Sequence, residues 1–336
     1  MPKFELDPSV RPQDDFYSYV NGGWKKNTPI PNDRSDWGTF YELRERTLQQ
    51  QIQLIHSILA KAKQSEAELS SLQQMIVDFH SSFGNIDLRN SLSLAPIDSY
   101  LTSLQTIKDY DELTNQFAQL IRLGITIPFA LQVNVHPKNP ERYVLFLTQS
   151  GLGLPDREYY LSDAKEEHRQ RYQQYIADLF RLTGNENGAK KAEQIMALEK
   201  TLASLHWSTA DKRDEDKTCN SINITEINTK LPGFNWILFL KALDVPVLEL
   251  DATQNQGLFS HPNIGINALI AKEDSAIAGF ADLFQRIPLE TWIHYLTFHL
   301  LDDMAPFLTS ELEHLHFQFH KTLNGVTDEP SLEKNR

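Results

Sequence analysis

The sequence contains a single cysteine, Cys219, which excludes an intrachain disulfide. A fold built without disulfides suits a reducing compartment, although many periplasmic proteins also lack them. Cys219 lies in a polar segment with no histidine close to it in sequence. We therefore do not expect it to act as a catalytic nucleophile, which would need an activating base beside it.

Long hydrophobic runs are also missing. The densest one, residues 234–243, is far shorter than the ~20 apolar residues that span a bilayer. The residues after Met1 are acidic and polar, without the apolar region of an export signal. These features predict a cytoplasmic protein with no membrane partner. A periplasmic protein whose export signal has been trimmed is the alternative.

Basic residues are in the minority, and the net charge of the 336-residue chain is −13. A nucleic-acid surface needs clustered Lys and Arg, so no nucleic-acid partner is expected. With 40% hydrophobic and 23% charged residues, the chain has the composition of an ordinary globular protein. Its length allows one large or two medium domains with a substantial core.

Apolar residues recur at helical spacing along most of the chain, which predicts a mainly α fold. The stretches with this pattern are residues 48–59, 69–83, 97–123, 163–184, 195–205, 289–301 and 306–323. Asp163 and Glu166 form a pair typical of a capping box, and Gly124 and Gly184 mark helix ends. Residues 128–149 differ, because apolar residues alternate on both sides of a Pro- and Asn-containing turn. This pattern predicts one small β hairpin.

Three motifs are too unusual for ordinary helix sequence. They are residues 11–24 with their continuation to Phe40, residues 151–160 (Gly-Leu-Gly-Leu-Pro-Asp-Arg-Glu-Tyr-Tyr), and residues 198–203 followed by Arg213-Asp214 and Asn220. Taken singly, each reads as structural, because Gly, Pro and aromatic residues usually form turns. Residues 151–153 do not form a nucleotide-binding loop, since the third glycine is missing and Pro155 occupies the start of the next helix.

Taken together, these motifs resemble the N-terminal region of the neprilysin and oligopeptidase O family of zinc metalloendopeptidases. The matching strings include Pro12-x-x-Asp15-Phe16, Gly22-Gly23-Trp24 and the Gly-Leu-Gly-Leu-Pro run, and Trp292-x-x-Tyr295 fits a later helix. The resemblance covers nearly the whole chain. Two cysteines of the animal members are Gln13 and Asn21 here, which favours the bacterial branch.

The resemblance implies zinc-assisted peptide hydrolysis, which needs a His-Glu-x-x-His helix and a further carboxylate ligand. None of the 11 histidines begins such a motif. In this family the zinc ligands belong to a C-terminal catalytic half. We therefore expect no catalytic residue, metal ligand or cofactor in this chain, and zinc in a catalytic half that it lacks, as in a truncated or split gene.

His316 and His320 imitate the motif, because they stand four residues apart with Glu313 one turn earlier. Phe317 occupies the place of the catalytic glutamate, and Phe317 and Phe319 have the character of core residues. Histidine pairs on helices are more often packing or surface residues than ligands, so no metal site is predicted here.

The resemblance also implies which residues of this chain bind substrate. Phe40 matches a residue that helps to line the pocket for the residue after the scissile bond, and Arg44 matches an arginine facing the substrate's C-terminal side. A second family arginine is Asp36 here, and a nearby family acid is Tyr41, which weakens an expected preference for a free C-terminus. Arg34 is the nearby candidate to substitute for that arginine. Without the resemblance, an ion pair of Arg44 with Glu42 or Glu45 is the simpler interpretation.

The expected organisation has an irregular segment at residues 1–40 that packs on a catalytic lobe, a helical domain at residues 41–330, and a divergent tail at residues 331–336. The leading function is a substrate-enclosing portion of a zinc metalloendopeptidase that acts on peptides and is inactive alone, with a separate catalytic chain as a possible partner. The alternatives are a non-catalytic module that binds peptides or a partner, and a product without function.

Overall fold

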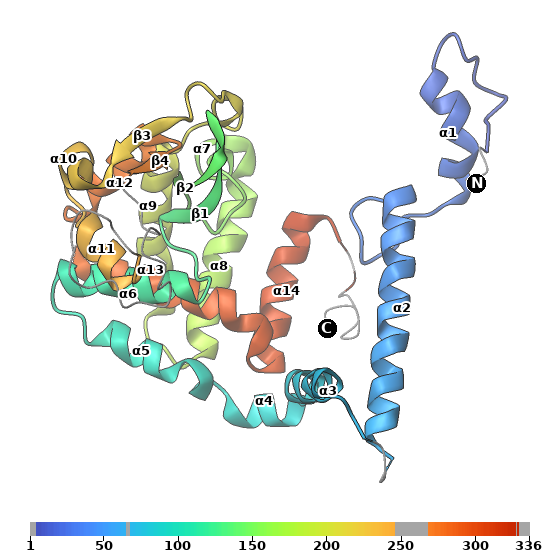
Figure 1. Ribbon diagram of the computed structural model, residues 1–336, viewed down its shortest axis with the longest axis horizontal. Helices are drawn as coiled ribbons and strands as arrows, with labels where there is room; N and C mark the ends of the chain where they lie inside the picture. Colours follow the sequence, from blue (N-terminus) through green and yellow to red (C-terminus); the bar gives the residue numbers. More distant parts are fainter. Residues whose placement is uncertain (1–4, 65–67, 246–267, 327, 329–336) are drawn as a thin grey trace. The chain divides into compact units, whose positions relative to one another are not determined.

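The computed structural model describes residues 5–64, 68–245, 268–326 and 328 (Figure 1). The described residues form two compact units, one of residues 1–88 with 317–336 and a larger one of residues 89–316. The boundaries fall inside helices α4 (Ile86–Leu92) and α14 (Ser310–Asn324). Among the described residues, no helix is both long and apolar enough to cross a membrane.

The smaller unit is built from helices. Besides the ends of α4 and α14, they are α1 (Phe16–Asn27), α2 (Thr39–Ala62) and α3 (Ser71–Gly84). Asp15 caps α1 by accepting from the Ser18 amide. The segment before α1 folds back on it, since the Asp7 amide donates to the Tyr19 carbonyl at 2.8 Å and the Asp7 carboxylate pairs with Lys26 at 2.7 Å.

The larger unit is helical with one sheet. Its further helices are α5 (Asp98–Gln105), α6 (Tyr110–Arg122), α7 (Glu158–Leu161), α8 (Glu166–Leu182), α9 (Gly188–Leu205), α10 (Ile227–Lys230), α11 (Trp236–Ala242), α12 (Asp274–Phe284) and α13 (Leu289–Met304). Short 3₁₀ turns lie at Ala95–Ile97, Asp163–Lys165, Asp211–Arg213, Ile224–Glu226 and Ala305–Phe307. The mainly α fold with a small β element is thereby confirmed.

The predicted hairpin is present as β1 (Phe129–His136) and β2 (Asn139–Gln149), paired antiparallel. It belongs to a sheet of four strands in the order β1-β2-β4-β3. Strand β4 (Ala268–Ala271) runs parallel to β2, and β3 (Asn220–Asn223) pairs antiparallel with β4. These four-residue strands come from distant parts of the chain and are too short to show an alternating pattern in the sequence.

Two local predictions were wrong. The helix expected over residues 97–123 is broken between α5 and α6, because Asp109 starts a new helix by accepting from the Glu112 amide at 2.8 Å. The capping box expected at Asp163 is replaced by a 3₁₀ turn, and α8 begins at Glu166 without a side-chain cap. Gly124 and Gly184 do end helices, with φ of +78° and +73°.

The expected domain limits remain predictions. Helix α1 lies inside the segment at residues 1–40 that was expected to be irregular. The tail at residues 331–336 lies outside the described residues.

The core of the larger unit is aromatic. Phe117 is fully buried and its ring centroid lies 5.9 Å from that of Trp292 and 6.0 Å from that of Phe234. Phe129 at the start of β1 lies 5.0 Å from Trp236. Since aromatic pairs at these separations add to the free energy gained by burying their area, this cluster joins the sheet to the helices around it.

Replacing Phe117 by Ala should lower the free energy of unfolding of the larger unit by about 3–5 kcal/mol, because a large side chain is lost from a packed site. Tyr143→Ala in β2 is the matched control. Its ring is 77% exposed, so a change below about 0.5 kcal/mol is expected. Urea unfolding followed by tryptophan fluorescence measures both, and equal effects would contradict the assignment of the core.

Candidate functional site

Phe40 and Arg44 lie in the first turns of α2, in the smaller unit. The Phe40 side chain is 88% exposed, and Arg44 is exposed as well. Because residues four apart in a helix share a face, the phenyl ring and the guanidinium are presented on the same side of α2. Among the described residues with large apolar side chains, Phe40 is the most exposed.

The two acids next to Arg44 are engaged elsewhere. Glu42 accepts from Trp24 Nε1 at 3.2 Å, and Glu45 pairs with Arg34 Nη2 at 3.3 Å. Within the described residues, Arg44 makes neither of the ion pairs considered from the sequence. Arg34 is paired with Glu45 and only about a quarter exposed, so its charge is already partly compensated.

Asp36 and Tyr41 lie beside this pair. The side chain of Tyr41 hydrogen-bonds with Asp36, and this bond, followed by the charge of Asp36, raises the pKa of the Tyr41 hydroxyl. The Tyr41 ring also stacks on Trp37 with centroids 6.2 Å apart. The two positions that differ from the family pattern therefore satisfy each other by a tyrosine–carboxylate hydrogen bond.

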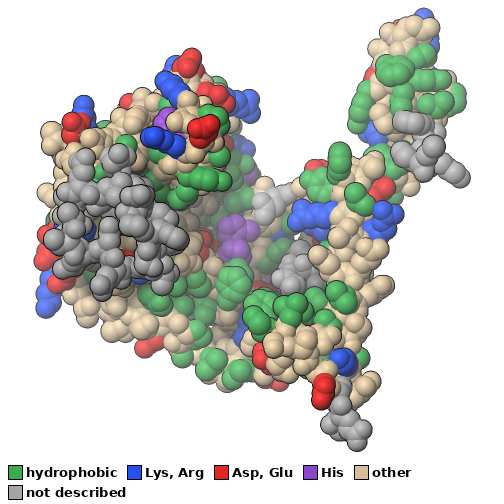
Figure 2. Space-filling view, viewed as in Figure 1, with side chains coloured by type: hydrophobic (Ala, Val, Ile, Leu, Met, Phe, Trp, Pro, Cys, Tyr) green, Lys and Arg blue, Asp and Glu red, His purple; other side chains and the backbone are tan. Residues whose placement is uncertain are grey.

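Exposed apolar side chains also gather over α1 and α3 of the smaller unit (Figure 2). On α1, Phe16 and Tyr17 are 68% and 64% exposed. On α3, Leu72, Met75 and Phe79 are each about two-thirds exposed and recur at helical spacing. Groups of exposed apolar side chains such as these are typical of surfaces that contact a partner, because water solvates them poorly.

The Gly-Leu-Gly-Leu motif lies in the larger unit, where it surrounds a buried carboxylate. Glu199 of α9 is fully buried. One carboxylate oxygen accepts from Tyr160 at 2.5 Å and from the Gly153 amide at 3.4 Å. The other accepts from Tyr172 at 3.0 Å and lies 2.9 Å from His299 Nε2. The motif that contains Glu199 thus contacts the loop motif directly.

His299 is buried as completely as Glu199. Burial alone lowers the pKa of its ring, but the hydrogen bond and charge of Glu199, with smaller contributions from Asp303 and Asp302, raise it overall. Burial, followed by the charge of Glu199, raises the pKa of Tyr160 and Tyr172 well above the ordinary value, so both hydroxyls remain protonated donors. The raised pKa of His299 favours the protonated ring beside the Glu199 carboxylate.

Two glycines of the loop are required by close contacts. Gly151 has φ of +91°, and its carbonyl accepts from Tyr295 at 2.9 Å. A Cβ on Gly153 would lie 1.8 Å from the hydroxyl of Tyr172. The glycines therefore serve packing against the tyrosines around Glu199, as the structural interpretation predicted.

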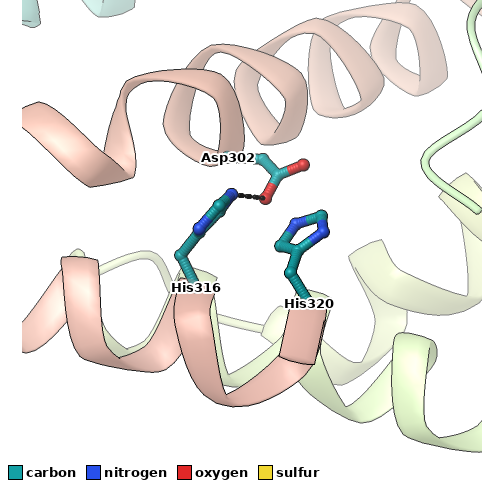
Figure 3. A group of neighbouring side chains, drawn as sticks. All are labelled: Asp302, His316 and His320. Carbon is teal, nitrogen blue, oxygen red and sulfur yellow. Dashed lines mark ion pairs between the residues drawn. The ribbon is translucent and has the colours of Figure 1, made fainter. Parts of the chain in front are cut away.

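A further group involves the two histidines of α14. Asp302 of α13 accepts from Tyr175 at 2.5 Å and lies 3.8 Å from His316 Nε2. His320 follows one turn later in the same helix (Figure 3). These side chains are of types that bind zinc, but Phe317 stands where a peptidase needs its glutamate. They therefore do not fit the catalytic zinc site of a His-Glu-x-x-His peptidase.

Comparison with known proteins identifies the family. Residues 12–336 match the N-terminal model of Peptidase family M13. The chain belongs to Peptidase family M13. Endothelin-converting enzyme 1 of Bos taurus is 25% identical over 334 residues, 96% of this chain and 41% of the relative. The enzyme of Homo sapiens is 30% identical over 249 residues, 72% of this chain and 32% of the relative.

Solved structures agree with this assignment to Peptidase family M13. The zinc metalloprotease ZMP1 of Mycobacterium tuberculosis, in complex with an inhibitor, superposes with a TM-score of 0.85 at 28% identity over 98% of this chain and 48% of that one. PepO of Lactobacillus rhamnosis shares the fold, with a TM-score of 0.74 at 17% identity over 97% of this chain and 48% of that one. The chain spans less than half the length of these relatives.

The substrate roles chosen for residues from the sequence remain predictions. The structure places Phe40 and Arg44 on one helical face and ties Arg34 to Glu45 instead. Sequence reasoning singled out the segment of Glu199 but missed its partner His299. The Trp292-x-x-Tyr295 spacing continues to His299 at the next turn of α13, which is the signal that could have revealed it.

Replacing Glu199 by Gln should destabilise the larger unit by about 3–5 kcal/mol below pH 6.5, because one partner of a buried ion pair is removed. The pKa of His299 is raised by folding, so the stabilisation is complete below its unfolded value of about 6.5 and disappears as the pH rises through the folded pKa. The difference between the two proteins should therefore shrink at alkaline pH.

Unfolding in urea at several pH values between 5.5 and 9 measures this difference. Glu167→Gln, which removes an exposed ion pair with Arg171, is the control and should change little at any pH. A loss in Glu199→Gln that is constant over the whole range would show that His299 is not the titrating partner.

Proposed function

We propose that this chain is the N-terminal, substrate-enclosing part of a zinc-dependent metalloendopeptidase and does not hydrolyse peptides by itself. The observation that carries the proposal is the match to Peptidase family M13 over residues 12–336, combined with the lack of any His-Glu-x-x-His in these 336 residues. The catalytic zinc and its ligands would come from a catalytic region, either in the same polypeptide or in a second chain.

Phe40 and Arg44 are the residues we assign to the substrate. The exposed phenyl ring offers an apolar surface for a peptide side chain, and the guanidinium is suited to a peptide carbonyl or carboxylate. Two features support the assignment. Both side chains lie on one face of α2, and the acids that would neutralise Arg44 are bonded to Trp24 and Arg34.

Asp36 and Tyr41 modify the expected specificity. A relative with an arginine at position 36 has a second cation for a substrate carboxylate, whereas this chain has a carboxylate bonded to Tyr41. A carboxylate near the substrate's C-terminal side would repel a free C-terminus. We infer that peptide selection depends more on the apolar contact with Phe40 than on a terminal charge.

The exposed apolar side chains of α1 and α3 favour this proposal over an independent peptide-binding module. A module that functions alone would be expected to cover its surface with polar side chains, because soluble monomers rarely expose large apolar patches. Phe16, Tyr17, Leu72, Met75 and Phe79 instead offer apolar area to a partner such as a catalytic region.

A peptidase assay on the purified chain, with and without added zinc and with a chelator, tests the proposal. We expect no chelator-sensitive cleavage of short peptides by the chain alone. We expect cleavage after it is joined to, or mixed with, the catalytic region of an M13 relative. Chelator-sensitive cleavage by the chain alone would overturn the proposal.

In such a reconstituted enzyme, Phe40→Ala should lower kcat/KM for peptides with a large apolar residue after the scissile bond about tenfold to a hundredfold, because one apolar wall of the pocket is lost. Tyr143→Ala is the matched control, since it removes another exposed aromatic ring that lies outside α2 and outside the apolar side chains of α1 and α3.

Peptides that carry alanine at the same position separate a pocket effect from a folding effect. Phe40→Ala should affect them much less than the apolar peptides. Equal losses for both peptides, or equal losses in the Tyr143 variant, would count against a substrate role for Phe40.

A further inference from the structure

Two cavities of the larger unit are candidate binding sites. One of about 450 Å³ is lined by residues 90–94, 182–184 and 309–312. The other, of about 210 Å³, is smaller but has charged side chains that suit a ligand. It lies within the larger unit, between the loop that follows β2 and the segment that follows α9. Its walls come from residues 149–157, which include the Gly-Leu-Gly-Leu motif, and from residues 206–212. It is lined mainly by polar groups, which distinguishes it from a packing defect in the core.

Arg157 is the principal cation of this cavity. Its Nη1 donates to the His206 carbonyl at 2.5 Å, which fixes the guanidinium against the second wall. Its Nε is buried without a hydrogen bond and lies 3.5 Å from the mostly exposed carboxylate of Glu158. The ion pair with the exposed Glu158 carboxylate is screened by water and is not a hydrogen bond, so an anion bound in the cavity would be a better partner for the guanidinium.

Lys212 supplies a second positive charge from the opposite wall. Among the described residues, neither its ammonium group nor the hydroxyls of Ser150 and Thr209 have a protein hydrogen-bond partner. The lining also contains one acid, Asp156, which accepts from the Glu158 amide at 2.8 Å. Arg157, Lys212 and Asp156 of the lining therefore sum to one net positive charge, while the mostly exposed Glu158 carboxylate lies outside the lining.

The pKa of His206 is affected by the same two cations. Burial, together with the charges of Lys212 and Arg157, lowers the pKa of its ring to about 4, although a hydrogen bond with the Ser150 backbone acts in the opposite direction. The ring is therefore neutral at pH 7 and adds no further charge to the cavity. Lys212 and Arg157 both lie close enough to His206 to disfavour a positive charge on its ring.

We propose that this cavity binds a small oxyanion, a carboxylate or phosphate group, held by Arg157 and Lys212. The planar guanidinium presents parallel N–H donors that fit two oxygens of either group, and the ammonium adds a point charge. The site lies within one unit and is independent of the peptidase proposal, because it uses neither Phe40 nor zinc.

Binding would also stabilise the loop. Leu154, which lines the cavity, donates its amide to the hydroxyl of Tyr160, and Tyr160 donates in turn to Glu199. A ligand that binds only the folded loop raises the free energy of unfolding in proportion to the logarithm of its concentration. The fraction of cavities that hold a ligand and the stability of the hydrogen bonds around Glu199 should therefore rise together.

Titration of the intact chain with sodium phosphate and, separately, with sodium acetate at constant ionic strength tests the site. Thermal unfolding and the amide NMR signals of Gly151 and Gly153 are the readouts. We expect saturable shifts with at least one anion. Saturation by phosphate alone assigns a phosphate group, and saturation by acetate assigns a carboxylate. No saturable shift with either anion up to about 20 mM overturns the proposal.

Three variants sharpen the test. Lys212→Gln should weaken binding about three- to tenfold without unfolding the chain, because Lys212 is exposed. Arg157→Lys keeps the positive charge but loses the paired N–H donors of the guanidinium, and should weaken binding tenfold or more. Lys230→Gln, an exposed lysine of α10 outside the lining, is the control. Equal weakening by Lys230→Gln and Lys212→Gln would show a general charge effect and contradict the site.

Discussion

The buried carboxylate of Glu199 is the constraint on which the larger unit depends. An ionised carboxylate is expensive to remove from water unless hydrogen bonds and an opposite charge replace the solvent. Tyr160 of α7, Tyr172 of α8, His299 of α13 and the Gly153 amide supply them. Three helices and a loop must therefore meet at α9 for the carboxylate to be satisfied, and this fixes the loop that follows the sheet.

Much of the fold could be predicted from the sequence because it is encoded locally. Helical periodicity located α2, α3 and α9, and the turn between alternating apolar residues located the β1–β2 hairpin. The break before α6 was also local, since Asp109 is an N-cap residue that the apolar pattern concealed. Strands β3 and β4 could not be predicted, because they are short and pair across long sequence separations.

The site was less predictable, for related reasons. The bond between Glu199 and His299 joins residues 100 positions apart. The Trp292-x-x-Tyr295 spacing places His299 on the same face of its helix, but it does not indicate that Glu199 is the partner. Phe40 and Arg44 were chosen through the family resemblance, whereas their local sequence favoured a surface ion pair for Arg44. The structure removes that objection, because Glu42 and Glu45 are bonded to Trp24 and Arg34.

The two motifs with the most glycine and aromatic residues, at residues 151–160 and 11–40, have different roles. The Gly-Leu-Gly-Leu loop lets tyrosines approach the buried acid and forms one wall of the polar cavity. The segment up to Phe40 leads into a helix that presents an aromatic ring and a guanidinium to solvent. The first use accounts for how the larger unit holds together, and the second for how the chain would contact a peptide.

The most direct test of the substrate-facing role is a photo-crosslink from position 40. A benzoylphenylalanine there, in the chain reconstituted with an M13 catalytic region, should crosslink to a bound peptide inhibitor, and excess unlabelled inhibitor should abolish the crosslink. A second variant carries the benzoylphenylalanine at position 79. An active enzyme that crosslinks to the peptide from position 79 but not from position 40 would contradict the account.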